Sequence, residues 1–164
     1  MDKKSQQQVD IKEATDKVSP EEYQKFINQL KLETIFLSSI KFNKVADAHL
    51  RDLRGATIDL PKPQGSFINS KDPQRAFATL TYNATIVDSD EELLEAEIAY
   101  TAEFSYETTQ FDIYNFTLFF EFSLLNILHP YFRRTLDQLI SESYMGHFIM
   151  PLLKTVFEKS EDND

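Results

Sequence analysis

The sequence predicts an α+β fold, in which an antiparallel sheet of about four strands carries helices on one face. Three observations lead to this class. Two long segments alternate apolar and polar residues on either side of a short turn, a helix start precedes them, and a strongly apolar helical segment follows them. Strand segments that are followed by helices, rather than alternating with them, are typical of α+β domains. The length of 164 residues suits one domain.

The sheet prediction depends on two segments with a period of two. Within residues 76–87 the apolar face is Ala76, Ala78, Leu80, Tyr82, Ala84 and Ile86, and after a turn at residues 88–91 it is Leu94, Ala96, Ile98, Tyr100, Ala102, Phe104 and Tyr106. The linker is too short for a parallel crossover, so the two strands form an antiparallel hairpin. The opposite face of the second strand is acidic, with Glu95, Glu97, Glu103 and Glu107.

An amphipathic helix and a strand are predicted ahead of the hairpin. Residues 19–22 read Ser-Pro-Glu-Glu, which combines a capping box with proline at the first helical position. We expect a helix over residues 20–30, because Tyr23, Phe26 and Ile27 then share one face. From Lys31 the period changes to two, which predicts a strand to about Val45 whose even-numbered face is the apolar one.

The remaining segments are assigned from their breakers and periodicity. Residues 46–73 contain scattered Gly and Pro, and we interpret them as a long connection with one irregular strand at residues 57–60. Beyond Gln110 the pattern is helical and apolar over most of its circumference, which indicates burial in a core or between subunits. Pro130 is expected to start a second helix that ends near Gly146, before an extended piece at residues 148–156.

The domain organisation follows from composition. Residues 1–18 are polar and without a period, so we expect them to be disordered. Residues 19–157 are expected to form a single domain, and residues 158–164 a flexible acidic tail.

Composition argues against several classes of function. The chain has no cysteine, which excludes disulfides and thiol chemistry, and its net charge of −10 disfavours binding to nucleic acid. It lacks a signal-peptide core and any long uncharged apolar run, so we expect a cytoplasmic protein without membrane insertion. His49, His129 and His147 lie in different segments without metal-ligand spacing. The outer-face glutamates are more consistent with a solvated or protein-docking face than with a catalytic pair, so we expect no enzyme activity, cofactor or metal.

The aromatic content is the feature that points to a function. There are 14 Phe and 7 Tyr, although the mean hydropathy is −0.40. An interaction protein with aromatic binding surfaces and an acidic, solubilising coat would have this composition. From composition alone, a monomer core or an obligate oligomer interface explains the aromatics equally well.

Two segments carry a resemblance to a known family. Residues 126–133, Asn-Ile-Leu-His-Pro-Tyr-Phe-Arg, resemble the Asn-x-Leu-Phe-Pro-Tyr-Ala-Arg signature of the SecB export chaperones. Residues 35–42, Ile-Phe-Leu-Ser-Ser-Ile-Lys-Phe, are similar to the family's first strand. The resemblance covers most of residues 32–150. It implies a four-stranded sheet backed by helices, a dimer of dimers, and an ATP-independent holdase that binds non-native polypeptide in an apolar groove.

The departures from the family narrow this expectation. Ser39 and Asn43 stand where the family has acids that dock the motor ATPase SecA, Glu95 replaces a leucine, and Met145-Gly146 replaces Phe-Pro. The family's C-terminal helix is missing, and a helix has been added at the front. This pattern resembles the divergent members encoded with toxin–antitoxin pairs, whose client is an antitoxin and some of which act in phage defence. A general export chaperone that delivers to SecA, and an oligomeric scaffold without a client groove, remain as alternatives.

Two sets of residues are predicted from this resemblance together with the apolar pattern. The predicted client-binding residues are Phe36, Phe42, Leu60, Phe67, Ile68 and Phe148. The predicted oligomer-interface residues are Phe119, Phe122, Leu125 and Tyr131.

Overall fold

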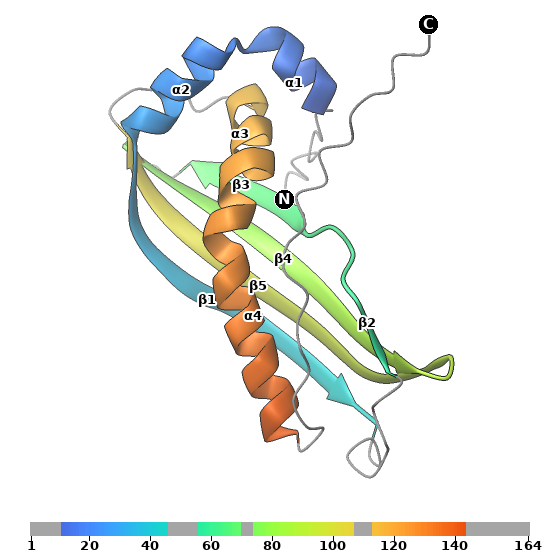
Figure 1. Ribbon diagram of the computed structural model, residues 1–164. Helices are drawn as coiled ribbons and strands as arrows, with labels where there is room; N and C mark the ends of the chain where they lie inside the picture. Colours follow the sequence, from blue (N-terminus) through green and yellow to red (C-terminus); the bar gives the residue numbers. More distant parts are fainter. Residues whose placement is uncertain (1–10, 46–55, 70–73, 107–112, 144–164) are drawn as a thin grey trace, which may run out of the picture.

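The computed structural model describes residues 11–45, 56–69, 74–106 and 113–143. One curved antiparallel sheet is crossed on one face by a long helix, and two shorter helices lie at one end (Figure 1). The strands are β1 (Leu30–Lys44), β2 (Thr57–Asp59), β3 (Gln64–Asn69), β4 (Arg75–Asp88) and β5 (Glu91–Tyr106). Their order is β1-β5-β4-β2, and β3 also pairs with β4. The predicted α+β class is confirmed, with β2 and β3 sharing the fourth position.

The β4–β5 hairpin is the centre of the sheet, as predicted. Its two turn residues, Ser89 and Asp90, have φ of 51° and 67°. A two-residue turn with both φ values positive twists in the same sense as the flanking strands, which is why it closes hairpins well. Every residue of the predicted apolar face, from Ala76 to Ile86 and from Leu94 to Tyr106, is buried. This face points toward the long helix.

Strand β1 contains two β-bulges that the sequence pattern did not reveal. Its register with β5 shifts between Leu32 and Thr34 and again between Leu37 and Ser39, so Glu33 and Ser38 are the extra residues. Each inserted residue moves the side chains that follow it to the other face of the sheet. The second bulge therefore reverses the effect of the first.

Between the bulges the expected apolar face of β1 is wrong. Phe36 pairs with Thr101 on the outer face, away from the helices, whereas Leu37 pairs with the helix-facing Tyr100. Outside this interval the prediction holds, because Ile40 and Phe42 pair with the helix-facing residues of β5.

In its described part, residues 56–69, the long connection forms two strands rather than one. β2 pairs with the C-terminal end of β4, and β3 pairs with its N-terminal half. The residues between them include Pro61 and Pro63. Proline has no N–H to donate to a ladder, so the pairing is interrupted between β2 and β3.

The long helix is continuous from residue 113 to residue 142. It consists of α3 (Ile113–Phe119), the π-helical turn η3 (Phe120–Leu124) and α4 (Leu125–Glu142). Pro130 lies inside α4, so the prediction that it starts a second helix is wrong. The wider turn inserts one residue, which places Phe119 and Leu124 both toward the sheet although they are five residues apart. The Asn126 side chain donates to the carbonyl of Phe122 at 3.0 Å and so satisfies an acceptor in this turn.

Two helices precede the sheet. α1 (Ile11–Lys17) packs on α3 and buries Ala14 completely, so the expectation of disorder is wrong for residues 11–17. α2 (Pro20–Gln29) has the predicted capping box. Its Phe26 ring packs edge-on against Phe119, with 6.4 Å between ring centroids. Figure 1 shows both helices across the end of the sheet where α3 begins.

The capping box gives a testable pH dependence. Ser19→Ala should lower the free energy of unfolding by about 1 kcal/mol at neutral pH. The Ser19 backbone N–H, and after it the Ser19 side chain, holds the pKa of Glu22 below its ordinary value of 4.5. A carboxyl with a depressed pKa stabilises the fold above its unfolded pKa, and this contribution is lost as the pH falls through the folded value. In urea denaturation, the difference between Glu22→Gln and the parent should therefore shrink below pH 4.5, because the carboxylate that accepts from the Ser19 N–H is then protonated, whereas Ser19→Thr should keep most of the cap. A difference that stays constant with pH would contradict this account.

Candidate functional site

The exposed apolar side chains concentrate on strand β1. Leu32, Phe36, Leu37 and Ile40 are each between 39% and 44% exposed. Phe36 lies on the outer face, while the other three lie on the helix side. β1 ends the strand order, so in the described part of the chain one of its edges has no strand partner. An apolar edge strand is a template for adding another extended chain.

A second apolar feature lies where β3 meets the long helix. The rings of Phe67 and Phe116 have centroids 4.3 Å apart, and Phe120 follows at 6.4 Å from Phe116. The Nζ atom of Lys62 lies 5.9 Å from the Phe120 ring centroid. It also forms an ion pair with Glu121. We call Phe67, Phe116 and Phe120 the β3–helix cluster.

The structure divides the predicted client-binding residues between two faces. Phe42, Leu60 and Phe67 are partly buried against the core, on the helix side. Phe36 is on the outer face, and Ile68, 68% exposed, shares that face because it pairs with Phe77. Phe148 lies outside the described residues.

The predicted acidic face is present, but ion pairs offset much of its charge. Glu95, Glu97 and Glu103 share the outer face of β5, because their strand partners lie on that face. Lys41 contacts Glu97 at 2.7 Å, and Arg75 contacts Glu103 at 2.5 Å. The pairing with Glu97 raises the pKa of Lys41. Glu107 lies outside the described residues.

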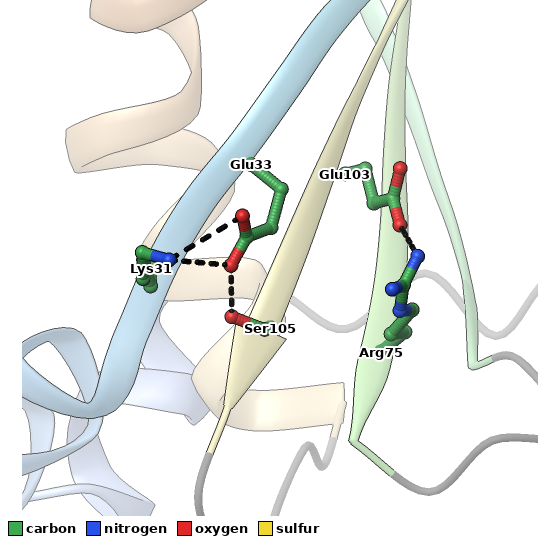
Figure 2. A network of polar contacts seen from close by, with 5 residues as sticks. All are labelled: Lys31, Glu33, Arg75, Glu103 and Ser105. Carbon is green, nitrogen blue, oxygen red and sulfur yellow. Dashed lines mark hydrogen bonds and ion pairs between the residues drawn. The ribbon is translucent and has the colours of Figure 1, made fainter.

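The first bulge adds another carboxylate to this face. Glu33 accepts a hydrogen bond from the Ser105 hydroxyl at 2.5 Å and pairs with Lys31 at 3.1 Å (Figure 2). The Ser105 hydroxyl, and after it Lys31, lowers the pKa of Glu33. The carboxylates shown in Figure 2 thus each have a cation beside them, which makes this end of the face less attractive to a cationic partner than the sequence suggested.

The middle of the outer face is formed by hydroxyl side chains. Thr101 is bonded on one side to Ser38 and on the other to Thr79, with 2.8 Å between the two threonine oxygens. The alternation of Thr with apolar residues signalled a polar face, but no local pattern could show that Ser38 would join this row through a bulge.

The predicted interface residues also separate. Phe119 is 2% exposed and Leu125 is buried, so both belong to the core of the single chain. Phe119 is covered by Phe26 of α2 and by Phe104 of β5. Phe122 and Tyr131 are 45% and 44% exposed and remain candidates for contact with another subunit.

The described segments hold no cluster of metal-ligating side chains. His129 is buried beside Tyr82 and Phe132, in a packing environment, while His49 and His147 lie outside the described residues. Burial raises the pKa of Tyr82 above its ordinary value, so this phenol stays protonated. Among the described residues no group of three or more His, Asp or Glu could hold a metal ion. In the same part of the chain, no helix has the length and apolar character needed to span a membrane.

Comparisons with known proteins identify the fold. No family model matches the sequence, and no curated protein matches it. Among solved structures, the Rv1957 SecB-like chaperone of Mycobacterium tuberculosis, in complex with a ChAD peptide from the HigA1 antitoxin, is similar with a TM-score of 0.69. The match has 14% identity and covers 88% of this chain and 100% of that one. The chain therefore has the SecB-like fold, as the resemblance in residues 35–42 and 126–133 predicted.

A second solved structure is much less similar. It is a protein of unknown function from Streptococcus agalactiae, with a TM-score of 0.39, 9% identity, and coverage of 75% of this chain and 96% of that one. A likeness this weak does not bear on the fold or on the function.

The placement of Phe36 and Phe42 on opposite faces can be tested by stability. Phe42→Ser should cost about 3 kcal/mol of unfolding free energy, because it removes a partly buried ring from the core. Phe36→Ser, on the solvated face, should cost less than about 1 kcal/mol. Urea denaturation at one protein concentration gives both values. Equal losses would show that the two rings share one face and that the bulges do not form.

Proposed function

We propose that the protein is an ATP-independent holdase that binds extended, aggregation-prone polypeptide and serves a dedicated client, the antitoxin of a toxin–antitoxin module. The observation that carries this proposal is apolar surface outside the core and away from the edge of β1: Phe36 and Ile68 are exposed on the outer face, and Phe67 is only partly buried, in a chain whose net charge is −10. Apolar surface of this kind binds flexible chains by burial, at about 25 cal/mol per Å² of apolar area. The acidic coat keeps such a surface soluble. We place the protein in the cytoplasm, and a role in phage defence is consistent with such a module.

The antitoxin client is supported by the likeness in fold and by the outer face. The M. tuberculosis protein of the same fold was solved with an antitoxin peptide bound. On the outer face, Lys41 and Arg75 offset Glu97 and Glu103. Docking to SecA would need carboxylates that have no cation beside them. We therefore favour a dedicated client over delivery to SecA.

We further propose that the subunits assemble as a dimer of dimers. The free edge of β1 is suited to antiparallel pairing with a second copy, which would cover Leu32, Leu37 and Ile40. Phe122 and Tyr131, the exposed aromatic residues of the described long helix, would then join the two dimers.

The holdase activity is tested with a chemically denatured model enzyme diluted into buffer. A stoichiometric amount of the protein should suppress light scattering from the aggregating enzyme, and added ATP should change nothing. If the enzyme aggregates fully even with an excess of the protein, the only remaining alternative is an oligomeric scaffold without a client groove.

The client class is tested by two binding measurements with the purified protein. We expect tight binding to the antitoxin encoded beside it and no binding to SecA. Binding to SecA, measured by calorimetry at low salt, would favour the alternative of a general export chaperone, for which Glu95, Glu97 and Glu103 on one face are the supporting observation.

The assembly is tested with Phe122→Asp. A carboxylate at this exposed position of η3 would have to be desolvated in an interface, so the variant should dissociate. Light scattering should report a lower mass than for the parent. Gln138→Glu, which adds the same charge at an exposed position of α4, serves as the control and should leave the mass unchanged. An unchanged mass for Phe122→Asp would remove this residue from the interface.

A further inference from the structure

We propose that Phe120 is a built-in plug, whose ring occupies a subsite over Gly65 that takes an aromatic side chain of the bound polypeptide. The proposal rests on the holdase function above and adds to it a named subsite and a way to regulate it. In this proposal Gly65 forms a wall of the subsite, and the ring of Phe120 is the plug that fills it. The ion pair between Lys62 and Glu121, which we call the clasp, holds the ring in place.

The subsite exists because strand β3 has no side chain at residue 65. Gly65 pairs with Leu80, so a side chain there would point toward the long helix. A Cβ atom built on Gly65 would overlap the Cε2 and Cδ2 atoms of the Phe120 ring. The ring therefore lies directly against the backbone of β3, in a space that any other residue at position 65 would fill.

The π-helical turn presents Phe120 to this space. Phe120 is the first residue of η3, directly after the deeply buried Phe119. Its neighbour Glu121 forms an ion pair with Lys62, whose Nζ atom lies 5.9 Å from the centroid of the Phe120 ring. The same lysine thus contacts the plug and the residue that follows it. Lys62 belongs to the segment between β2 and β3, so the clasp connects that segment to the helix.

The plug is placed where it can leave. Phe120 is only partly buried at the edge of the core, whereas the core rings Phe119 and Phe132 are almost completely covered. Gly65, against which the ring lies, is itself an exposed residue. The side chain of Lys62 is 64% exposed and that of Glu121 19%, so water reaches the ion pair from the lysine side and weakens its hold on the two partners. Rotation of one side chain would free the subsite without moving the backbone.

The space left behind suits an aromatic ring. Phe67 and Phe116 form its remaining walls, because Phe116 contacts both Phe67 and Phe120. A phenylalanine side chain of the client would regain the contacts that Phe120 gives up. Because the protein must first displace its own ring, the apparent affinity for such a client is lowered by the fraction of molecules in which the subsite is open.

The experiment compares four forms of the full chain, the parent and three variants, for their binding to two labelled peptides. One peptide contains serine, lysine and a single central phenylalanine, and the other has alanine at that position. Phe120→Ala should bind the phenylalanine peptide at least about threefold more tightly than the parent, because the cost of opening is removed. Its affinity for the alanine peptide should stay unchanged.

The matched control is the double variant Gly65→Val with Phe120→Ala. The valine side chain fills the subsite without overlapping a ring, and valine is well tolerated in strands. This variant should lose the gain shown by Phe120→Ala. Circular dichroism and thermal unfolding show whether each variant is folded, and Phe120→Leu, which keeps an apolar side chain next to Gly65, provides a second measurement, with a smaller gain expected.

Three results would overturn the proposal, and they are distinguishable. If the parent binds the phenylalanine peptide and folded Phe120→Ala binds it no more tightly, the plug is wrong and the holdase function stands. If neither the parent nor any variant binds either peptide, and the parent also fails to suppress aggregation, the holdase function and the subsite fall together. If the double variant still binds the phenylalanine peptide more tightly than the parent, the aromatic side chain does not bind at Gly65.

Discussion

The structure depends on the contact between the long helix and the β4–β5 hairpin. On the face of the hairpin that meets the helix, small and large side chains alternate: Ala78 and Ala84 are fully buried beside Leu80 and Tyr82. The alanines leave room for rings from the helix. The Tyr82 ring stacks on Phe132 with centroids 4.3 Å apart and only 8° between their planes. At the other end Phe104 meets Phe119 edge-on at 5.2 Å. A sheet face of large residues alone would hold the helix too far away for such contacts.

Much of this arrangement could be predicted from the sequence, because local signals governed it. The hairpin follows from strict alternation and a short polar turn, and α2 follows from a capping box and proline at its first position. The signature around Pro130 and the first strand indicated the SecB-like fold. The same signals did not reveal the two bulges of β1. Each bulge shifts the inward–outward alternation by one residue, so the two together leave the residues at both ends of the strand facing the same way as in a regular strand.

The other differences come from tertiary packing. Pro130 is tolerated in a helix interior whose buried stripe, including Leu128, Phe132 and Leu136, gains more from contact with the sheet than the lost hydrogen bond costs. α1 is too short to be stable in isolation and forms because Ala14 is buried against α3. Of the candidate site, the apolar character of β1 and of residues 60–68 could be predicted. The opposite placement of Phe36 and the approach of Phe120 to Gly65 could not, because they depend on a bulge and on a π-helical turn that leave no periodic signal.

The bulges at Glu33 and Ser38 also limit what β1 can join. A flat, regular edge of fifteen residues could pair with almost any apolar extended chain in many registers. A holdase of the proposed kind would then form sheets with its own clients and aggregate. Each bulge breaks the spacing of the edge's donors and acceptors, so a straight strand can match it only over a short interval. A second copy in antiparallel orientation brings its own pair of irregularities and can align them with these two. In the proposed dimer, the same distortion that turns Phe36 outward would restrict the edge of β1 to a subunit whose own irregularities match it.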